Sequence, residues 1–220
     1  MIKAQLASGE DNYARWSLNI KPHWSPGYLW SRTKEYFFRK NHPDYPWLTQ
    51  DAIRILTSLL KPTDHILEFG SGRSTIWFAK RVGKITSVEN HAAWFKVVEQ
   101  MLKSLNWKVD YSLVPDDEHQ EAGYRELLSR IPDESIDLCL VDGGPRALCA
   151  VESVSKVKRG GFVVIDNVNW FLPSESKSPS SLRSLDACDP QFRHFYEMVK
   201  NWRVIWTSNG VTDTAFYIKP

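Results

Sequence analysis

The amino-acid sequence predicts an α/β protein with a mostly parallel sheet and helices on both faces. Segments with strand character alternate with segments of helical periodicity along most of the chain, which is the pattern of a parallel sheet. The segments 135–144 and 161–167 are almost continuously apolar, as strands buried on both faces must be. Two strand-like segments close the chain with only Gly210 and its neighbours between them, which predicts an antiparallel hairpin.

Regular structure is expected to begin at Thr49. Thr49 can cap a helix in which Ile53, Leu56 and Leu60 share one face, and Lys61–Pro62 ends that helix. Strands and helices are then expected to alternate. We predict strands at residues 65–70, 84–90, 108–114, 135–144 and 161–167, intervening helices at 74–82, 91–105, 121–131 and 147–157, and a last helix and hairpin at 191–202, 203–209 and 213–220.

The helix predicted at residues 91–105 is amphipathic. Trp94, Val98, Met101 and Leu105 recur on one side of it. This periodicity predicts that the four side chains form one apolar face of the helix.

Two segments fall outside the regular pattern. Residues 1–48 form an N-terminal extension, broken by prolines, with one short helix around 28–40, and residues 49–220 form the main domain. The early tryptophans can pack onto the domain or line a pocket. Residues 168–190 are rich in Ser and Pro, and together with Trp170 they are expected to act as a lid over a bound molecule.

Composition and charge argue against several classes of protein. The 220 residues carry a formal net charge of +2 and no dense Lys/Arg run, which argues against a dedicated nucleic-acid binder. No apolar stretch approaches the roughly 20 residues that cross a bilayer, and the start lacks the apolar core of a signal peptide. The three cysteines form no CxxC pair, so we expect reduced, structural thiols. This pattern is typical of a cytoplasmic protein. The sequence does not indicate the oligomeric state.

The stretch ILEFGSGRST, residues 66–75, follows the first predicted strand. Gly70 allows a tight turn and Gly72 lets a ligand approach the backbone, at a strand end where open α/β sheets bind ligands. The GxGxxG and GxxxxGK[ST] patterns are absent, and Glu68 would repel a phosphate. The loop therefore favours a cationic nucleoside cofactor without phosphate, S-adenosylmethionine. Glu89, about 20 residues after Glu68, can accept both ribose hydroxyls.

The segments LEFGSGRST, SVEN, IDLCLVDGG and GGFVVIDN follow the order of the motifs of class I S-adenosylmethionine-dependent methyltransferases. From about Thr49 to Pro220 the chain resembles this family. The resemblance implies a Rossmann-like, seven-stranded, mostly parallel sheet that ends in an antiparallel hairpin. It also implies that the methionine part of the cofactor lies near the glycine loop and the ribose near Glu89. The cofactor-binding residues on this basis are Glu68, Gly70, Ser71, Gly72, Ser74, Glu89, Asn90 and Asp142.

Both acidic residues also have a purely structural explanation. Glu68 can be a half-buried carboxylate paired with Arg73 or with a backbone amide. Glu89 can cap the helix that starts near His91.

Polar side chains close the fourth and fifth predicted strands. Asp142 ends the fourth, and Asp166 and Asn167 end the fifth. Adjacent parallel strands bring these three together, and their oxygens suit Mg²⁺ or Ca²⁺. The arrangement is similar to that of metal-dependent O-methyltransferases acting on catechols and caffeoyl-CoA, which implies a divalent ion that activates and orients the acceptor hydroxyl. Alternatively, the same residues contact cofactor or substrate without a metal.

The catalytic candidates are Asp142, Arg146 and His91. The metal-dependent enzymes carry a lysine base three residues after the first Asp, whereas this chain has Pro145 there and Arg146 next. Arg146 stays protonated and cannot act as a base, but it can bind a carboxylate or phosphate of the substrate. His91 can act as a base, open its helix or contact the cofactor.

The leading hypothesis is a methyltransferase that transfers the methyl group of S-adenosylmethionine to an oxygen of a small molecule, with no nucleic-acid or membrane partner. One alternative is an aminopropyltransferase-like enzyme of the same fold. Another is a non-catalytic domain that only binds the cofactor. The products separate them, because only a methyltransferase forms S-adenosylhomocysteine.

Overall fold

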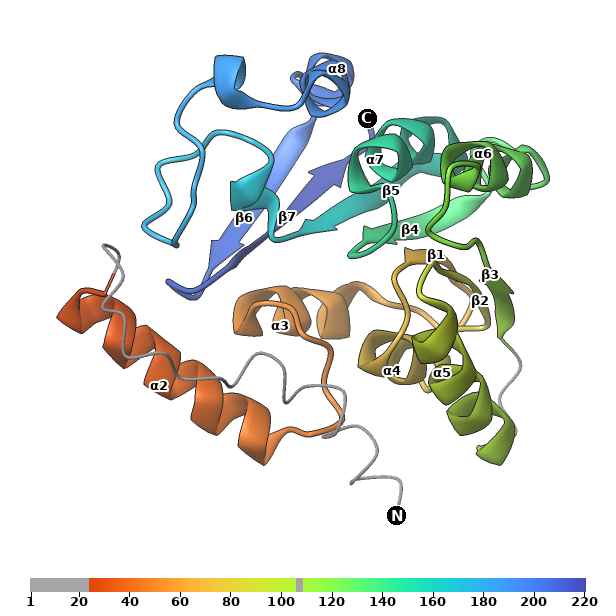
Figure 1. Cartoon of the computed structure of the whole chain (residues 1–220), viewed down its shortest axis with the longest axis horizontal. Helices are drawn as coiled ribbons and strands as arrows, with labels where there is room; N and C mark the ends of the chain where they lie inside the picture. The colour runs from red at the N-terminus through yellow and green to blue at the C-terminus, as the bar shows by residue number, and fades with distance from the viewer. Residues whose placement is uncertain (1–23, 106–108) are drawn as a thin grey trace.

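The computed structural model describes residues 24–105 and 109–220, so most of the predicted extension up to residue 23 lies outside it. Seven strands form one sheet in the order β3-β2-β1-β4-β5-β7-β6 (Figure 1). The first five are parallel, and β7 runs antiparallel to both β5 and β6. The predicted sheet and terminal hairpin are therefore confirmed. The strands are β1 (His65–Phe69), β2 (Lys84–Glu89), β3 (Asp110–Leu113), β4 (Ile136–Val141), β5 (Val157–Asp166), β6 (Arg203–Ser208) and β7 (Asp213–Ile218).

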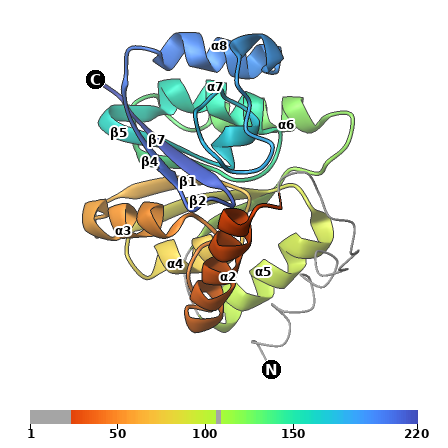
Figure 2. The same ribbon diagram turned by 90° about the vertical axis from the view of Figure 1, so that its left-hand side faces the viewer.

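Helices cover both faces of the sheet, as Figure 2 shows, with α6, α7 and α8 on one side and α3, α4 and α5 on the other. None of the helices within the described ranges has both the length and the apolar character needed to cross a membrane. The helices are α2 (Pro26–Asn41), α3 (Gln50–Leu59), α4 (Arg73–Ala79), α5 (Ala92–Ser104), α6 (Gln120–Ser129), α7 (Arg146–Lys156) and α8 (Pro190–Val199), with short 3-10 turns η2 (Val168–Trp170) and η3 (Leu185–Ala187).

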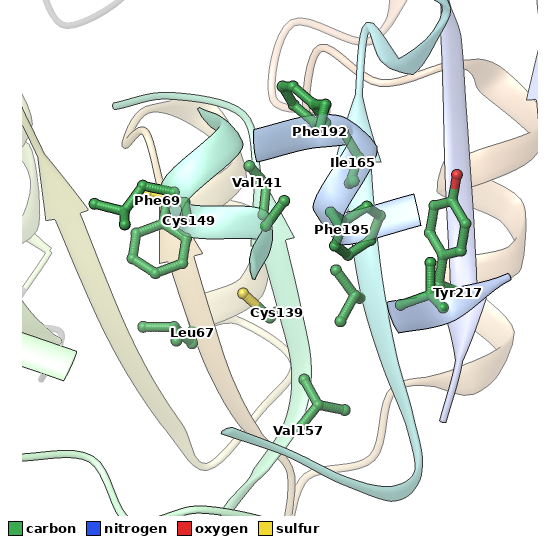
Figure 3. Packing of buried hydrophobic residues seen from close by; sticks show 14 of the residues in the cluster. Leu67, Phe69, Cys139, Val141, Cys149, Val157, Ile165, Phe192, Phe195 and Tyr217 are labelled. Atoms are coloured by element: carbon green, nitrogen blue, oxygen red, sulfur yellow. The ribbon is translucent and has the colours of Figure 1, made fainter. Parts of the chain in front are cut away.

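The central strands are apolar on both faces because each face has its own core. Leu67 and Phe69 of β1 join Cys139 of β4 in the core beneath α7 and α8 (Figure 3). Ile66 and Leu138, on the same two strands, belong to the core on the side of α3 and α4. The alternation of side chains along a strand thus places neighbouring residues in different layers.

Helix α3 begins as predicted, whereas the apolar face of α5 ends earlier than predicted. Thr49 caps α3 as expected, accepting a hydrogen bond from the backbone N–H of Ala52 at 3.2 Å. In α5 the apolar face ends at Leu102 instead of Leu105. Leu105 is 41% exposed because it is the C-cap residue, beyond the last turn whose side chains face the sheet.

The N-terminal helix α2 is longer than predicted. Ser25 caps it and Pro26 occupies its first turn, where a proline fits without breaking a hydrogen bond. Only Glu35 of α2 is buried, and its Oε2 accepts a hydrogen bond from Asn209 Nδ2 at 2.8 Å. This contact ties α2 to the turn between β6 and β7. The division of the chain into domains at residue 49 stays a prediction.

The Ser/Pro-rich segment after β5 is fastened to the sheet. Asn169 Nδ2 donates to the carbonyl of Pro179 at 3.0 Å, and Ser178 Oγ donates to Asp213 Oδ1 of β7 at 2.6 Å. Ser178 and Asp213 are both buried. These contacts favour a fixed loop over the lid that the composition predicts.

The three cysteines are free and buried, as expected for structural thiols. Cys139 lies on β4, Cys149 on α7, and Cys188 just before α8. Burial raises the pKa of all three thiols.

A backbone contact joins the loops that follow β1 and β4. A Cβ at Gly70 would lie 2.7 Å from the amide nitrogen of Gly143, and a Cβ at Gly143 would lie 2.6 Å from Gly70 Cα. Gly70 also has φ of +91°, so it makes the tight turn expected of it. The backbone of each glycine occupies the space that a side chain on the other would need.

Replacing Gly143 by Ala is therefore expected to lower the free energy of unfolding by about 1–3 kcal/mol, because the two loops must separate. The control is Gly27→Ala in the first turn of α2, where a Cβ meets nothing closer than 3.9 Å. Urea unfolding of both variants measures the difference. Equal stability of Gly143→Ala and the wild type would show that the loops can separate freely.

Candidate functional site

The predicted site residues gather at one edge of the sheet, at the carboxyl ends of β1, β2, β4 and β5. The strand order reverses between β1, which neighbours β2, and β4, which continues the sheet in the other direction. Ligands of open α/β sheets bind at such a reversal. The loop from Gly70 to Gly72 leaves β1 at this position.

Glu68 lies completely buried under the glycine loop. Its Oε2 accepts hydrogen bonds from Thr75 Oγ1 at 2.5 Å and from Ser87 Oγ at 2.6 Å. Its Oε1 has no hydrogen-bond partner among the described residues. Glu68 is therefore fully buried and bonded to hydroxyl groups, and not half-buried as the structural alternative expects. Burial raises the pKa of Glu68 to about 7, against the opposing effect of nearby hydroxyl groups.

Glu89 links the glycine loop to the start of α5. Its Oε2 accepts from the amide and hydroxyl of Ser71 at 3.0 and 2.6 Å, and its Oε1 accepts from the amides of Asn90 and His91 at 3.0 and 2.9 Å. Oε1 of Glu89 thus caps the start of α5, as the structural alternative expects. The other oxygen holds the glycine loop through Ser71. The Ser71 hydroxyl also lies 2.7 Å from that of Tyr111.

His91 and Trp94 have roles in the local structure. His91 is the N-cap of α5, and its Nδ1 accepts from the backbone N–H of Trp94 at 3.2 Å. Trp94 Nε1 donates to the carbonyl of Ser71 at 2.8 Å, and its ring is the nearest group to a Cβ built on Gly72, at 3.7 Å. Helical periodicity placed Trp94 on the apolar face of its helix, so its contact with the glycine loop was not predicted. Ser74 is buried in the first turn of α4.

The second cluster is organised by Arg146. Its Nη2 donates to the Asp142 carbonyl at 2.6 Å and to Asp142 Oδ1 at 2.9 Å. Its Nη1 donates to the Asp166 carbonyl at 2.8 Å and to Asn167 Oδ1 at 3.0 Å. The structure therefore brings Asp142, Asp166 and Asn167 to the same edge of the sheet, as predicted, and adds Arg146 as the residue that joins them, which was not predicted. The guanidinium cross-links the ends of β4 and β5.

These residues do not fit a divalent metal ion. Arg146 already holds Oδ1 of Asp142 and Oδ1 of Asn167, so a metal that used these oxygens would have to displace a permanent cation. Asp166 Oδ1 accepts instead from Thr214 Oγ1 on β7 at 2.7 Å. Across residues 24–105 and 109–220 no group of three or more His, Cys, Asp or Glu side chains could hold a metal.

The two aspartates differ in their surroundings. Burial raises the pKa of Asp142, while the charges of Arg146 and Arg39 oppose this rise. Burial and the charge of Asp142 raise the pKa of Asp166 further. The Asp142 side chain keeps 26% of its surface exposed, whereas Asp166 is buried. Asp142 is thus the carboxylate that a molecule entering from solvent can reach.

The titration of Glu68 gives a stability test. A pKa of 4.5 unfolded and about 7 folded means that the folded protein binds more protons between these values, so stability falls as pH rises through this window. In Glu68→Gln, the loss of unfolding free energy from pH 5 to pH 8 should be smaller than in the wild type by about 2–3 kcal/mol. Urea unfolding at both pH values measures this, with the exposed Glu126→Gln as control. Identical pH dependence of stability in the wild type and Glu68→Gln would contradict the raised pKa of Glu68.

No family model matches the chain, and no curated protein matches its sequence. Solved structures do match. A candidate caffeoyl-CoA O-methyltransferase from Staphylococcus aureus aligns over 99% of both chains with 14% identity and a TM-score of 0.54. A methyltransferase-like protein from Silicibacter pomeroyi aligns over 80% of this chain and 89% of its own, with 20% identity and a TM-score of 0.53.

A third structure, of a protein from Corynebacterium glutamicum, aligns over 99% of this chain and 97% of its own with 11% identity and a TM-score of 0.56. At such identities the likeness concerns the path of the backbone. It extends along nearly the whole chain in two of the three structures. The chain therefore has a Rossmann-like fold that it shares with solved methyltransferase structures, and the expected resemblance is confirmed at the level of the fold.

Proposed function

We propose that this protein is an S-adenosylmethionine-dependent methyltransferase that methylates an oxygen of a small hydroxylated acceptor without a resident metal. The observation that carries the proposal is the pair of buried carboxylates, Glu68 and Glu89, at the ends of adjacent parallel strands on either side of the glycine loop. Two carboxylates there disfavour a phosphate and favour a ligand with positive charge. S-adenosylmethionine is a nucleoside of this kind.

The contacts of these carboxylates support particular roles. The unpartnered Oε1 of Glu68 can accept a hydrogen bond from the ammonium group of the cofactor. At Glu89, the ribose hydroxyls would take the place of the Ser71 hydroxyl, because Oε2 already accepts from a hydroxyl there. The remaining contacts of the cofactor would come from the glycine loop and the positions next to it, at Gly70, Gly72, Ser74 and Asn90.

The bound cofactor would supply an electrophilic methyl group on sulfur. The acceptor hydroxyl must lose its proton to become a good nucleophile. We assign this task to Asp142, whose partly exposed carboxylate is held in place by Arg146. Arg146 orients Asp142 and balances its charge. Both of its Nη groups already donate two hydrogen bonds each, so neither base catalysis nor substrate binding is assigned to it.

We infer a small-molecule acceptor because a net charge of +2 argues against a dedicated nucleic-acid binder. His91 is not assigned a catalytic role because its ring caps α5. An aminopropyltransferase or a purely cofactor-binding domain would use the same loop. Formation of S-adenosylhomocysteine in the presence of an acceptor distinguishes the methyltransferase from both.

Glu89→Ala is expected to weaken binding of S-adenosylhomocysteine by about 1–3 kcal/mol, because hydrogen-bonding groups of ligand and loop lose their acceptor. Calorimetric titration measures the affinity. Glu99→Ala is the control, since Glu99 lies on α5 and pairs with Lys103 of the same helix. Unchanged affinity of Glu89→Ala would remove Glu89 from the cofactor site.

Asp142→Asn is expected to lower kcat by about 100-fold or more, because the amide cannot accept the acceptor's proton. Asp142 can accept a proton only when it is ionised, and its pKa is raised. Wild-type kcat/KM should therefore rise with pH in a range that lies above the pKa of an ordinary aspartate. EDTA should leave the rate unchanged. Methyl transfer to a panel of phenols and catechols measures these effects, with the exposed Asp51→Asn as control. A rate abolished by EDTA would refute the metal-free proposal.

A further inference from the structure

The helix α2 contributes to the edge of the sheet at which the proposed active site lies. Figure 1 shows it beside the end of the sheet where β6 passes into β7. A Cβ at Gly210 in that turn would lie 2.6 Å from Ser31 Oγ, and Asn209 donates to Glu35. These two contacts fix the position of α2 at this edge. Its next turn carries Arg39.

Arg39 is held from two sides. Its Nε donates to Oε1 of the buried Glu35, and its guanidinium carbon lies 4.8 Å from the centre of the Trp47 ring. Glu35 in turn accepts from Asn209, so the anchor of Arg39 is itself anchored. An arginine with its Nε bonded and its plane near an aromatic ring has a restricted orientation.

One end of this guanidinium lacks a partner. Nη1 of Arg39 is buried and has no hydrogen-bond acceptor within the described parts of the chain. Arg39 nevertheless lies close to the glycine loop, because the Trp47 ring beside it also lies 5.4 Å from the guanidinium carbon of Arg73, the residue directly after Gly72. In agreement with this position, the charge of Arg39 opposes the rise in the pKa of Asp142. A charged donor that is removed from water and left without an acceptor is unfavourable in the protein alone. Such a group can gain much from a ligand that brings the acceptor.

We propose that Arg39 binds a carboxylate of the molecules in the active site, a role that rests on the proposed function. The planar guanidinium matches a carboxylate in geometry and charge. A phosphate dianion would be disfavoured by the acidic groups nearby, Glu68, Glu89 and Asp142. The carboxylate has two sources, the amino-acid end of the cofactor or a carboxylate on the methyl acceptor. In either case α2, which lies outside the family resemblance, supplies a binding residue.

If the carboxylate belongs to the cofactor, Glu68 can bind the ammonium group next to it. The amino-acid end of S-adenosylmethionine carries an ammonium group beside its carboxylate. Glu68 offers a buried acceptor without a partner, and Arg39 offers a buried donor without one. The two unmet groups are complementary to the two charges of an amino acid.

The test compares ligands that differ only in the carboxylate-bearing part. Wild type, Arg39→Met, Arg39→Lys and the exposed control Arg32→Met are titrated with S-adenosylhomocysteine and with 5′-methylthioadenosine, which lacks the amino-acid end. A second arm, with saturating S-adenosylhomocysteine, titrates 3,4-dihydroxybenzoate and catechol. Binding of 5′-methylthioadenosine and catechol also reports whether a variant remains folded.

A loss of about tenfold or more for S-adenosylhomocysteine in Arg39→Met, with unchanged 5′-methylthioadenosine binding, supports the cofactor source. The same loss for dihydroxybenzoate, with S-adenosylhomocysteine and catechol unchanged, supports the acceptor source. Arg39→Lys should lie between Arg39→Met and the wild type, since it keeps the charge without the planar fork.

Two results overturn the proposal. One is wild-type affinity of Arg39→Met for both carboxylate-bearing ligands. The other is an equal loss for S-adenosylhomocysteine and 5′-methylthioadenosine, which would assign Arg39 a structural role only. If the wild type binds neither nucleoside, the proposed function itself fails and the role of Arg39 falls with it.

Discussion

The backbone contact between Gly70 and Gly143 is the constraint on which the candidate site depends. β1 and β4 are neighbours in a parallel sheet, so the loops that leave them must diverge or pack directly on each other. Two glycines allow the second arrangement. The glycine loop with Glu68 and the aspartate cluster around Arg146 therefore share one rigid base. A cofactor beside the first and an acceptor beside the second would be held close together without movement of either loop.

The site concentrates acidic side chains, and the fold satisfies each of them differently. Glu89 accepts four hydrogen bonds, two of them from the backbone at the start of α5. Asp142 has the guanidinium of Arg146. Glu68 receives only hydroxyl donors on one oxygen, and Asp166 has Thr214. The last two are thus stabilised least as anions, and burial raises their pKa values accordingly.

The sequence carried enough information to predict the order of strands and helices and the edge of the sheet where the polar residues meet. Both depend on local periodicity and on the rule that parallel strands end at a common edge. It did not reveal what Arg146 contacts, because its bonds to Asp166 and Asn167 span about one βα unit and depend on how α7 packs. Arg39 was missed for the same reason. Its position follows from the docking of α2 on a turn near residue 209, and no local pattern encodes that contact.

The three buried thiols give the protein a built-in reporter of its own opening. Cys139, Cys149 and Cys188 lie on a central strand, on the helix that packs over it, and at the entry to α8. A thiol that is buried and held neutral reacts with a disulfide reagent only after its surroundings open. The order in which the three sulfurs are labelled would therefore reveal which layer of the molecule loosens first, with no probe added to the sequence.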